Sequence, residues 1–295
     1  MIKRIKNAIF WCLMRFKNRC VAFIIHEVKA TYYEIKTRIT FPSESYGKSH
    51  ELPEKLIISL TSYPPRFPSL ALTIKCLLRQ SVRPDKVILW IAEDDVLLLP
   101  QSVKALVSDD DFEIRVCEDI GSYKKIIPTL KLFPDAFIVT ADDDLYYTND
   151  WLEKLIDDWD GDYKNIVAHR IHRIRMDKNN TPLPYNEWEF EILEGDDVNF
   201  HFATSGAGIL YPPKSFDTRV MDKDIFMDIC SNADDVWLFW MSRLNGGKTT
   251  KSSYDMVTLT WRGSQSVALF HDNVLNNQND CKINAMIDKF GWVNI

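Results

Sequence analysis

The sequence has little glycine and proline, no closely paired cysteines and fewer positive than negative charges. Ten Gly and thirteen Pro, without internal repeats or low-complexity tracts, argue against a long linker. Six Cys without a Cys-x-x-Cys pair are typical of reduced thiols in a cytosolic protein. The net charge of −6 argues against a general nucleic-acid binder.

The sequence also predicts neither a membrane-spanning helix nor a cleaved signal peptide. The uncharged apolar stretch 8–14 is far shorter than the ~20 residues that cross a bilayer. No small-residue cleavage site follows it, so we do not expect a signal peptide. With 46% hydrophobic and 26% charged residues, the 295-residue chain has the composition of a globular protein with one large domain or two small ones.

The positive charge that is present gathers at the N-terminus. Residues 1–30 carry a net charge of +6, so the other 265 residues carry about −12. An amphipathic helix is predicted over this segment, and one of its faces collects Ile2, Ile5, Ile9, Leu13, Phe16, Cys20 and Phe23. Two interpretations stay open: residues 1–25 lie on an anionic membrane surface, or the helix packs on the protein's own body or a second subunit. The expected location is cytoplasmic, peripheral on the inner face of the cytoplasmic membrane in the first case.

Alternating strands and helices predict a mostly parallel sheet over residues 56–160. Each strand is apolar and ends in polar residues, so four polar loops should meet at one edge of the sheet. The predicted strands are Leu56–Thr61, Lys86–Ile91, Phe112–Cys117 and Phe137–Ala141, and the helices are 70–78, 100–107, 126–132 and 151–159, with Asp150 as a cap.

The second half of the chain is more mixed. A strand is predicted over 165–175, an aromatic loop over 177–200 and a glycine-bearing strand or turn over 202–211. A helix over 233–244 opens with two acids, and another helix ends the chain. Residues 31–54 are expected to be an irregular connector.

The most informative motif is Asp142-Asp143-Asp144 at the end of a buried strand. Asp has poor β-propensity, so the three acids should follow the strand rather than lie in it. Carboxylates this close raise one another's pKa unless a cation neutralises them. A hard ion such as Mg²⁺ or Mn²⁺ takes oxygen ligands and bridges carboxylates to phosphates. The alternative is a solvated acidic turn.

In this order along the chain, several motifs resemble a GT-A-fold glycosyltransferase of the family-two type. These are Thr61-Ser62-Tyr63-Pro64, Asp119 with Lys124-Lys125, the three Asp, Gly206-Ala207-Gly208 and Asp234-Asp235-Val236-Trp237. The resemblance covers about residues 56–245. It implies an α/β, Rossmann-like GT-A single domain with a mostly parallel central sheet, plus the N-terminal amphipathic helix. The expected segments are 1–30 basic helix, 31–54 connector, 55–265 catalytic domain (donor half 55–160, acceptor half 161–265) and 266–295 tail.

The resemblance also implies roles at the donor site. Thr61, Ser62, Tyr63 and Arg66 would contact the nucleotide, Arg66 by pairing with the diphosphate. Asp119 would accept from the base and Lys124 or Lys125 would bind phosphate, with the other lysine solvated. Asp142 would lie on the ribose or metal side, with Asp143 beside the donor. Asp144 would bind Mn²⁺ or Mg²⁺, and His271 is a candidate third ligand.

At the acceptor side, Asp235 would be the general base and Asp234 would support the acceptor. Gly206 and Gly208 would allow a sugar to approach the backbone. Trp237 would either line the sugar site or pack in the core.

The implied function is inverting, metal-dependent transfer from a nucleoside diphosphate sugar, with a UDP-sugar expected, to a cell-surface glycan such as lipopolysaccharide or capsule. One alternative is a nucleotidyltransferase, which would normally carry a Gly-rich basic loop where this chain has Tyr63-Pro64-Pro65-Arg66. The other is a non-catalytic glycan-binding relative.

Overall fold

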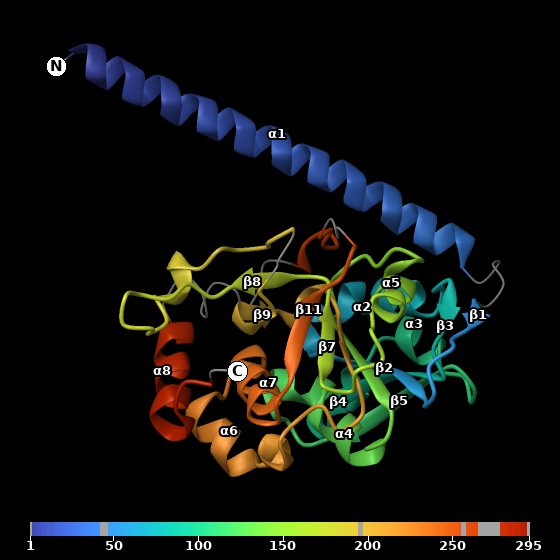
Figure 1. The fold of residues 1–295 in the computed structure, drawn as a ribbon. Helices are drawn as coiled ribbons and strands as arrows, with labels where there is room; N and C mark the ends of the chain where they lie inside the picture. The colour runs from blue at the N-terminus through green and yellow to red at the C-terminus, as the bar shows by residue number, and fades with distance from the viewer. Residues whose placement is uncertain (1, 42–46, 194–196, 255–257, 265–277, 294–295) are drawn as a thin grey trace.

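A computed structural model shows an α/β body crossed by one long helix (Figure 1). It describes residues 2–41, 47–193, 197–254, 258–264 and 278–293, and only the backbone of residues 2–20. The long helix, α1 (Ile2–Thr40), runs over one side of the body and its N-terminal half extends away from the sheet. No described helix is apolar enough over a sufficient length to cross a membrane.

A seven-stranded sheet forms the centre of the body, in the order β11-β7-β10-β6-β2-β4-β5. Six strands run in one direction, and β10 is antiparallel to both of its neighbours. The strands are β2 (Leu56–Thr61), β4 (Lys86–Ala92), β5 (Phe112–Cys117), β6 (Phe137–Ala141), β7 (Asn165–Ala168), β10 (Ile209–Tyr211) and β11 (Lys248–Lys251). The predicted α/β class and mostly parallel sheet are confirmed.

Helices cover both faces of this sheet. Alternate residues of a central strand enter different cores: Phe137 and Val139 belong to one apolar cluster, and Ile138 belongs to the other. The α-helices after α1 are α2 (Phe67–Leu77), α3 (Gln101–Lys104), α4 (Ile127–Leu132), α5 (Trp151–Asp157), α6 (Lys223–Ile229), α7 (Asp234–Leu244) and α8 (Gln278–Phe290).

Short elements complete the fold. Two small sheets pair β1 (Lys48–Ser49) with β3 (Val82–Arg83), and β8 (Ile171–Arg173) with β9 (His201–Ala203). The 3-10 turns are η1 (Pro64–Arg66), η2 (Glu93–Leu98), η3 (Gly121–Lys125), η4 (Tyr185–Glu187), η5 (Val198–Phe200), η6 (Ser205–Ala207) and η7 (Thr218–Met221). Of these, η1, η3 and η6 matter most, because they follow or flank the strand ends at one edge of the central sheet.

Three predictions of local structure are wrong. Residues 31–40 continue α1 rather than forming an irregular connector, because Ala30 and Thr37 are buried against the body. The strand predicted over 165–175 is interrupted between β7 and β8, which belong to different sheets. Asp150 makes no capping hydrogen bond, since its carboxylate accepts from the Thr148 hydroxyl instead.

Candidate active site

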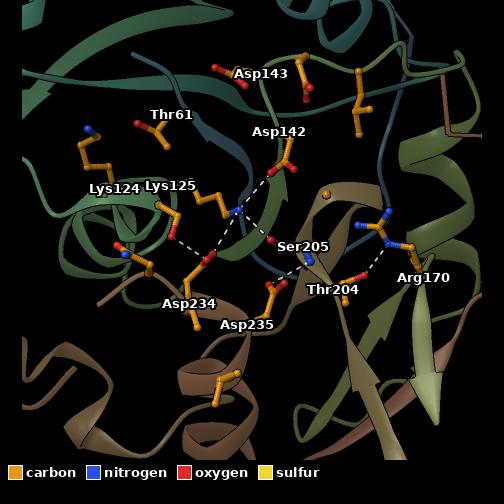
Figure 2. Close-up of a pocket in the computed structure, with 18 of the residues that line it drawn as sticks. Thr61, Lys124, Lys125, Asp142, Asp143, Arg170, Thr204, Ser205, Asp234 and Asp235 are labelled. Carbon is orange, nitrogen blue, oxygen red and sulfur yellow. Dashed lines mark hydrogen bonds and ion pairs between the residues drawn. The ribbon is translucent and has the colours of Figure 1, made fainter. Parts of the chain in front are cut away.

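A cavity of about 620 Å³ lies where the carboxyl ends of the parallel strands meet the start of α7. A cavity of this size accommodates a ligand as large as a cofactor. Its walls come from both halves of the chain, from Thr61 at the end of β2 to Asp235 in α7 (Figure 2). Twelve of the fifteen residues predicted for the site line it: Thr61, Ser62, Tyr63, Arg66, Asp119, Lys124, Asp142, Asp143, Asp144, Gly206, Asp234 and Asp235.

The buried Lys125 ammonium connects the two walls of the cavity (Figure 2). Its Nζ lies 3.1 Å from Asp142 Oδ1 and 3.2 Å from Asp234 Oδ2. It also donates a 2.7 Å hydrogen bond to Ser205 Oγ. Burial alone would lower the pKa of Lys125, but the surrounding Asp142, Asp234 and Asp235 charges raise it well above its ordinary value. The group therefore stays protonated.

The expectation that one of the two adjacent lysines is solvated is wrong. Lys124 and Lys125 are both buried and both line the cavity. The 3-10 turn η3 directs them to different partners, so that Lys124 pairs with Asp119 at the rim while Lys125 reaches the interior.

Asp235 lies on the opposite wall from the three consecutive acids. Its carboxylate accepts a 3.0 Å hydrogen bond from the Ser205 backbone N–H, and the residue keeps partial contact with solvent through the cavity. Burial in the cavity and the neighbouring Asp234 charge raise the pKa of Asp235 above its ordinary value. Lys125 and the Ser205 N–H act in the opposite direction. A carboxylate with a raised pKa is a stronger proton acceptor than an ordinary Asp.

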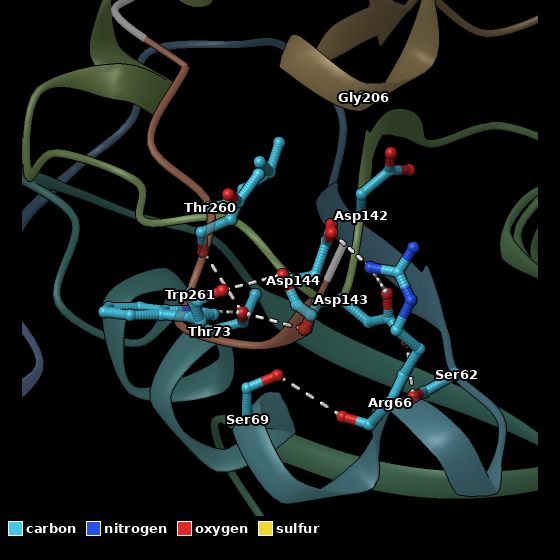
Figure 3. Close-up of polar contacts among 12 residues, drawn as sticks. Ser62, Arg66, Ser69, Thr73, Asp142, Asp143, Asp144, Gly206, Thr260 and Trp261 are labelled. Atoms are coloured by element: carbon cyan, nitrogen blue, oxygen red, sulfur yellow. Dashed lines mark hydrogen bonds and ion pairs between the residues drawn. The ribbon is translucent and has the colours of Figure 1, made fainter. Parts of the chain in front are cut away.

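The three consecutive acids have different environments (Figure 3). Burial would raise the pKa of Asp142, but Lys125 outweighs burial and lowers it. Burial raises the pKa of Asp143 to about 7, although its carboxylate accepts a 2.5 Å hydrogen bond from Ser62. Burial and the Asp142 charge raise the pKa of Asp144, whose carboxylate contacts the buried Arg66 guanidinium. Asp142 is thus the most firmly ionised of the three.

Asp142 and Asp144 offer carboxylate oxygens as ligands suited to a hard divalent cation. Arg66 lies against Asp144 where such a cation would bind, and burial and the Asp142 charge keep the pKa of Asp144 raised despite this contact. Among the described residues, no group of three or more His, Cys, Asp or Glu is arranged to hold a metal, and His271 lies outside them. The donor set fits an ion that takes its other ligands from a bound molecule and water, provided Arg66 moves off Asp144.

Two predicted sugar-binding residues lie elsewhere. Gly208 has φ +114°, and a Cβ there would come within 2.6 Å of the Trp151 ring, so this glycine makes room for a core tryptophan rather than for a sugar. Trp237 is fully buried and donates to the Val220 carbonyl, so it packs in the core. Gly206 does line the cavity, and a Cβ there would lie 2.7 Å from Asp142 Oδ2.

Sequence reasoning missed one end of the cavity. Arg170, between β7 and β8, donates to the Thr204 hydroxyl and borders the cavity beside Gly206 (Figure 2). Aromatic side chains form the wall beyond it: Tyr185, Phe190 and Phe202. The aromatic composition of the loop 177–200 was the available signal, but only folding brings that loop to the strand ends.

Segment 258–264 closes the cavity on the side of the three acids. The Trp261 N–H donates to the Asp144 carbonyl at 2.9 Å, and Thr260 lines the cavity (Figure 3). Helix α1 contacts the same segment, because His26 lies within hydrogen-bond distance of Thr260 and Glu27 pairs with Arg262. The C-terminal half of α1 is therefore attached to the wall of the cavity.

Solved structures with a related arrangement of elements have low sequence identity to this chain. 4-Diphosphocytidyl-2C-methyl-D-erythritol synthase from Anaerococcus prevotii is 13% identical, with a TM-score of 0.44 over 77% of this chain and 96% of that one. GalNAc-T7 with UDP, GalNAc and Mn²⁺ is 10% identical, with a TM-score of 0.43 over 78% and 48%. Inositol-1-phosphate CTP transferase from T. maritima is 7% identical, with a TM-score of 0.39 over 79% and 98%. These values are too low to transfer an activity.

Among curated proteins, no sequence matches this chain significantly. The family model described as "Glycosyl transferase family 2" matches residues 66–230, which is more than half of the chain. The matched range contains Arg66, Lys125 and the three consecutive acids. The chain therefore belongs to glycosyl transferase family 2.

Proposed function

We propose that this glycosyltransferase is inverting and metal-dependent, and that it moves a sugar from UDP-sugar to a cell-surface glycan such as lipopolysaccharide or capsule. One observation carries the proposal: a single cavity holds Asp142 and Asp144 on one wall and Asp235, with its raised pKa, on the other. Segment 55–160 would form the donor half of a catalytic domain over 55–265, and segment 161–265 the acceptor half. Helix α1 (Ile2–Thr40), a connector over 41–54 and the tail 266–295 would flank that domain.

The donor half supplies groups that suit a nucleoside diphosphate. Tyr63 offers a ring for the base or ribose, and Asp119 offers an acceptor for a base N–H. Arg66 and Lys124 are the cations available for phosphate oxygens, Arg66 with the geometry for two parallel hydrogen bonds. Because both already contact carboxylates, donor binding would exchange those ion pairs for phosphate contacts.

Asp142 and Asp144 would hold Mn²⁺ or Mg²⁺ together with the diphosphate. A bound divalent ion would offset the negative charge that grows on the departing nucleoside diphosphate. Arg66, released from Asp144, would remain close enough to offset part of the same negative charge.

Asp235 would act as the general base. It takes the proton from the acceptor hydroxyl while that oxygen forms a bond to the anomeric carbon and the carbon–phosphate-oxygen bond breaks. One direct displacement inverts the anomeric configuration. The Ser205 N–H and Lys125 keep the carboxylate oriented, and Arg170 with the aromatic wall would contact the acceptor sugar.

Residues 1–25 are proposed to lie on the anionic inner surface of the cytoplasmic membrane. Residues 1–20 contain six basic and no acidic residues, and this half of α1 extends away from the sheet (Figure 1). Such a placement would keep the cavity near a lipid-linked acceptor.

The first test of function is a donor screen that measures released nucleoside diphosphate with and without Mn²⁺. We expect UDP release that depends on Mn²⁺, and we expect Asp144→Ala to abolish it because the variant loses a metal ligand. Asp150→Ala, an acid outside the cavity, is the matched control and should keep full activity. Full Mn²⁺-stimulated activity of Asp144→Ala would exclude the metal role. Release of pyrophosphate from a nucleoside triphosphate would indicate a nucleotidyltransferase, and donor binding without turnover a non-catalytic relative.

Asp235→Asn should lower kcat by ~10²–10⁴-fold, because the amide cannot accept the proton. UDP and Mn²⁺ should still bind with near-native affinity, measured by calorimetry. Asp234→Asn is the neighbouring control and should lose much less. Product NMR should show an anomeric configuration opposite to that of the donor. Retention of configuration, or Asp235→Asn activity within a few-fold of wild type, would reject the assignment.

Activity should fall on the acid side at a higher pH than an ordinary Asp would dictate, since Asp235 must be ionised and its pKa is raised. Asp234→Asn removes a negative neighbour and should lower the pKa of Asp235, which moves the acid limb of kcat/KM to lower pH. Asp119→Asn removes an acid at the rim and should leave that limb in place. A pH–rate profile that is unchanged in Asp234→Asn, or shifted upward, contradicts this electrostatic account.

Deletion of residues 1–20 should release the protein from vesicles of anionic phospholipid while transfer to a soluble acceptor continues. Each basic residue near such a surface contributes roughly 1 kcal/mol, so binding by the full chain should also weaken with added salt. Neutral phosphatidylcholine vesicles serve as the control in a sedimentation assay. Undiminished vesicle binding by the truncated chain would show that another surface is responsible.

A further inference from the structure

Helix α1 has a second apolar face that the body leaves uncovered. Over residues 21–40, the face toward the body buries Ala30 and Thr37 and packs Tyr33 against the core. On the other side of the helix, among the described residues, a continuous row of large apolar side chains is between 47% and 74% exposed, with Ile24 (59% exposed) beside it: Val21, Ile25, Val28, Tyr32, Ile35 and Ile39. This row is called the outer stripe below. Figure 1 shows this part of α1 at the periphery of the molecule.

The outer stripe has the spacing of a coiled-coil seam. Its residues are separated by four, three, four, three and four positions, which is the a and d pattern of a heptad repeat. Ile25, Tyr32 and Ile39 take the a positions, and Val21, Val28 and Ile35 take the d positions. Continued toward the N-terminus, the same register places Trp11 and Asn18 at a and Met14 at d. More than three consecutive heptads therefore carry the pattern, which favours a coiled coil over an isolated amphipathic helix.

The positions of these residues around α1 leave room for a second helix along the outer stripe. At 100° per residue, the outer stripe and the row His26, Ala30, Tyr33 and Thr37 point about 150° apart. A helix packed along the outer stripe would consequently not meet the body that α1 already covers. Five of the six outer-stripe residues are β-branched, which lowers intrinsic helix propensity, so packing against the outer stripe would add stability that this stretch lacks by itself.

Net charge distinguishes residues 21–40 of α1 from the N-terminal half of the helix. Residues 21–40 carry a net charge of +1, whereas residues 1–20 carry +6, so the outer stripe offers little attraction for anionic lipid. In a parallel pair of these helices, each g residue faces the e residue five positions later on its partner. Those pairs are Lys17 with Ala22, Ile24 with Lys29, and Thr31 with Lys36, so no two like charges oppose each other.

We propose that the outer stripe binds a second copy of this chain, forming a parallel two-stranded coiled coil through residues 21–39. The two catalytic bodies would lie on outward sides of the helix pair. This proposal concerns assembly alone and holds whether or not the transfer reaction is as proposed above.

The test compares two substitutions in the full chain by sedimentation velocity without lipid. Val28 is 64% exposed on the outer stripe, and Phe23 is 65% exposed on the opposite side of α1. Val28→Glu should weaken the dimer by at least ~100-fold, because it places two like charges in a buried seam. Phe23→Glu removes as much exposed apolar surface and adds the same charge, yet should remain dimeric. Both variants should keep the wild-type melting temperature of the body at concentrations where the proteins are monomers.

Cysteine crosslinking tests orientation and register. Ile35→Cys should form a covalent dimer on mild oxidation, because equivalent d positions of a parallel pair approach closely enough for a disulfide. Phe23→Cys, with the same native cysteines, should not. A monomeric wild-type chain at tens of micromolar, a dimer that survives Val28→Glu, or crosslinking by Phe23→Cys alone would overturn the proposal. Loss of anionic-vesicle binding in Val28→Glu with no change in a monomeric mass would assign the outer stripe to lipid instead.

Discussion

The buried ammonium of Lys125 is the interaction on which the rest of the site depends. Six Asp side chains and Glu191 line one cavity, and without an internal cation the carboxylates would repel one another or take up protons. An isolated lysine in the same place would equally lose its charge. Lys125, Asp142 and Asp234 therefore depend on one another to stay charged inside the cavity. Because Asp142 follows β6 while Asp234 begins α7, this one group joins segments about ninety residues apart in sequence.

Neighbouring strands explain how the first acids are held. β2 and β6 pair in parallel, with Leu60 opposite Ala141, so the residues that follow each strand must meet. Ser62 thus reaches Asp143, and the turn after it carries Arg66 to Asp144. The result is a polar strand end in which all three acids lie near a cation, since Lys125 pairs with Asp142 and Arg66 contacts Asp144 and lies 3.8 Å from Asp143 Oδ1. Arg66 is already positioned where a phosphate group or a metal ion would compete with it.

Helix α1 links the site to the periphery. One of its faces contacts segment 258–264, which in turn packs on Asp144 through Trp261. Its other face carries the outer stripe. Any partner that binds this stripe, whether a second chain or another surface, would act on a helix that is attached to the cavity wall. The same helix thus carries a basic end, an apolar seam and a contact with the catalytic body.

The sequence by itself determined the parts of the protein that depend on local pattern. Apolar runs ending in polar residues predicted β2, β4, β5 and β6, and the parallel arrangement then predicted that these polar ends would share one edge. The order of motifs predicted the family and twelve of the residues that line the cavity. These features could be read because burial of a strand and the polarity of its end are both local properties of the chain.

Only the tertiary structure decided which of these residues touch and what each is for. Lys124 and Lys125 are equivalent in sequence, but the turn that carries them sends one to the rim and one to the interior. Gly208 and Trp237 lie in motifs that resemble a sugar site, yet one makes room for Trp151 and the other fills the core. The aromatic composition of the loop 177–200 was visible in the sequence, but the place of Arg170 and the aromatic wall beside Gly206 depends on how β7, β8 and η6 come together. Long-range packing sets those positions, and the spacing of residues along one chain does not encode it.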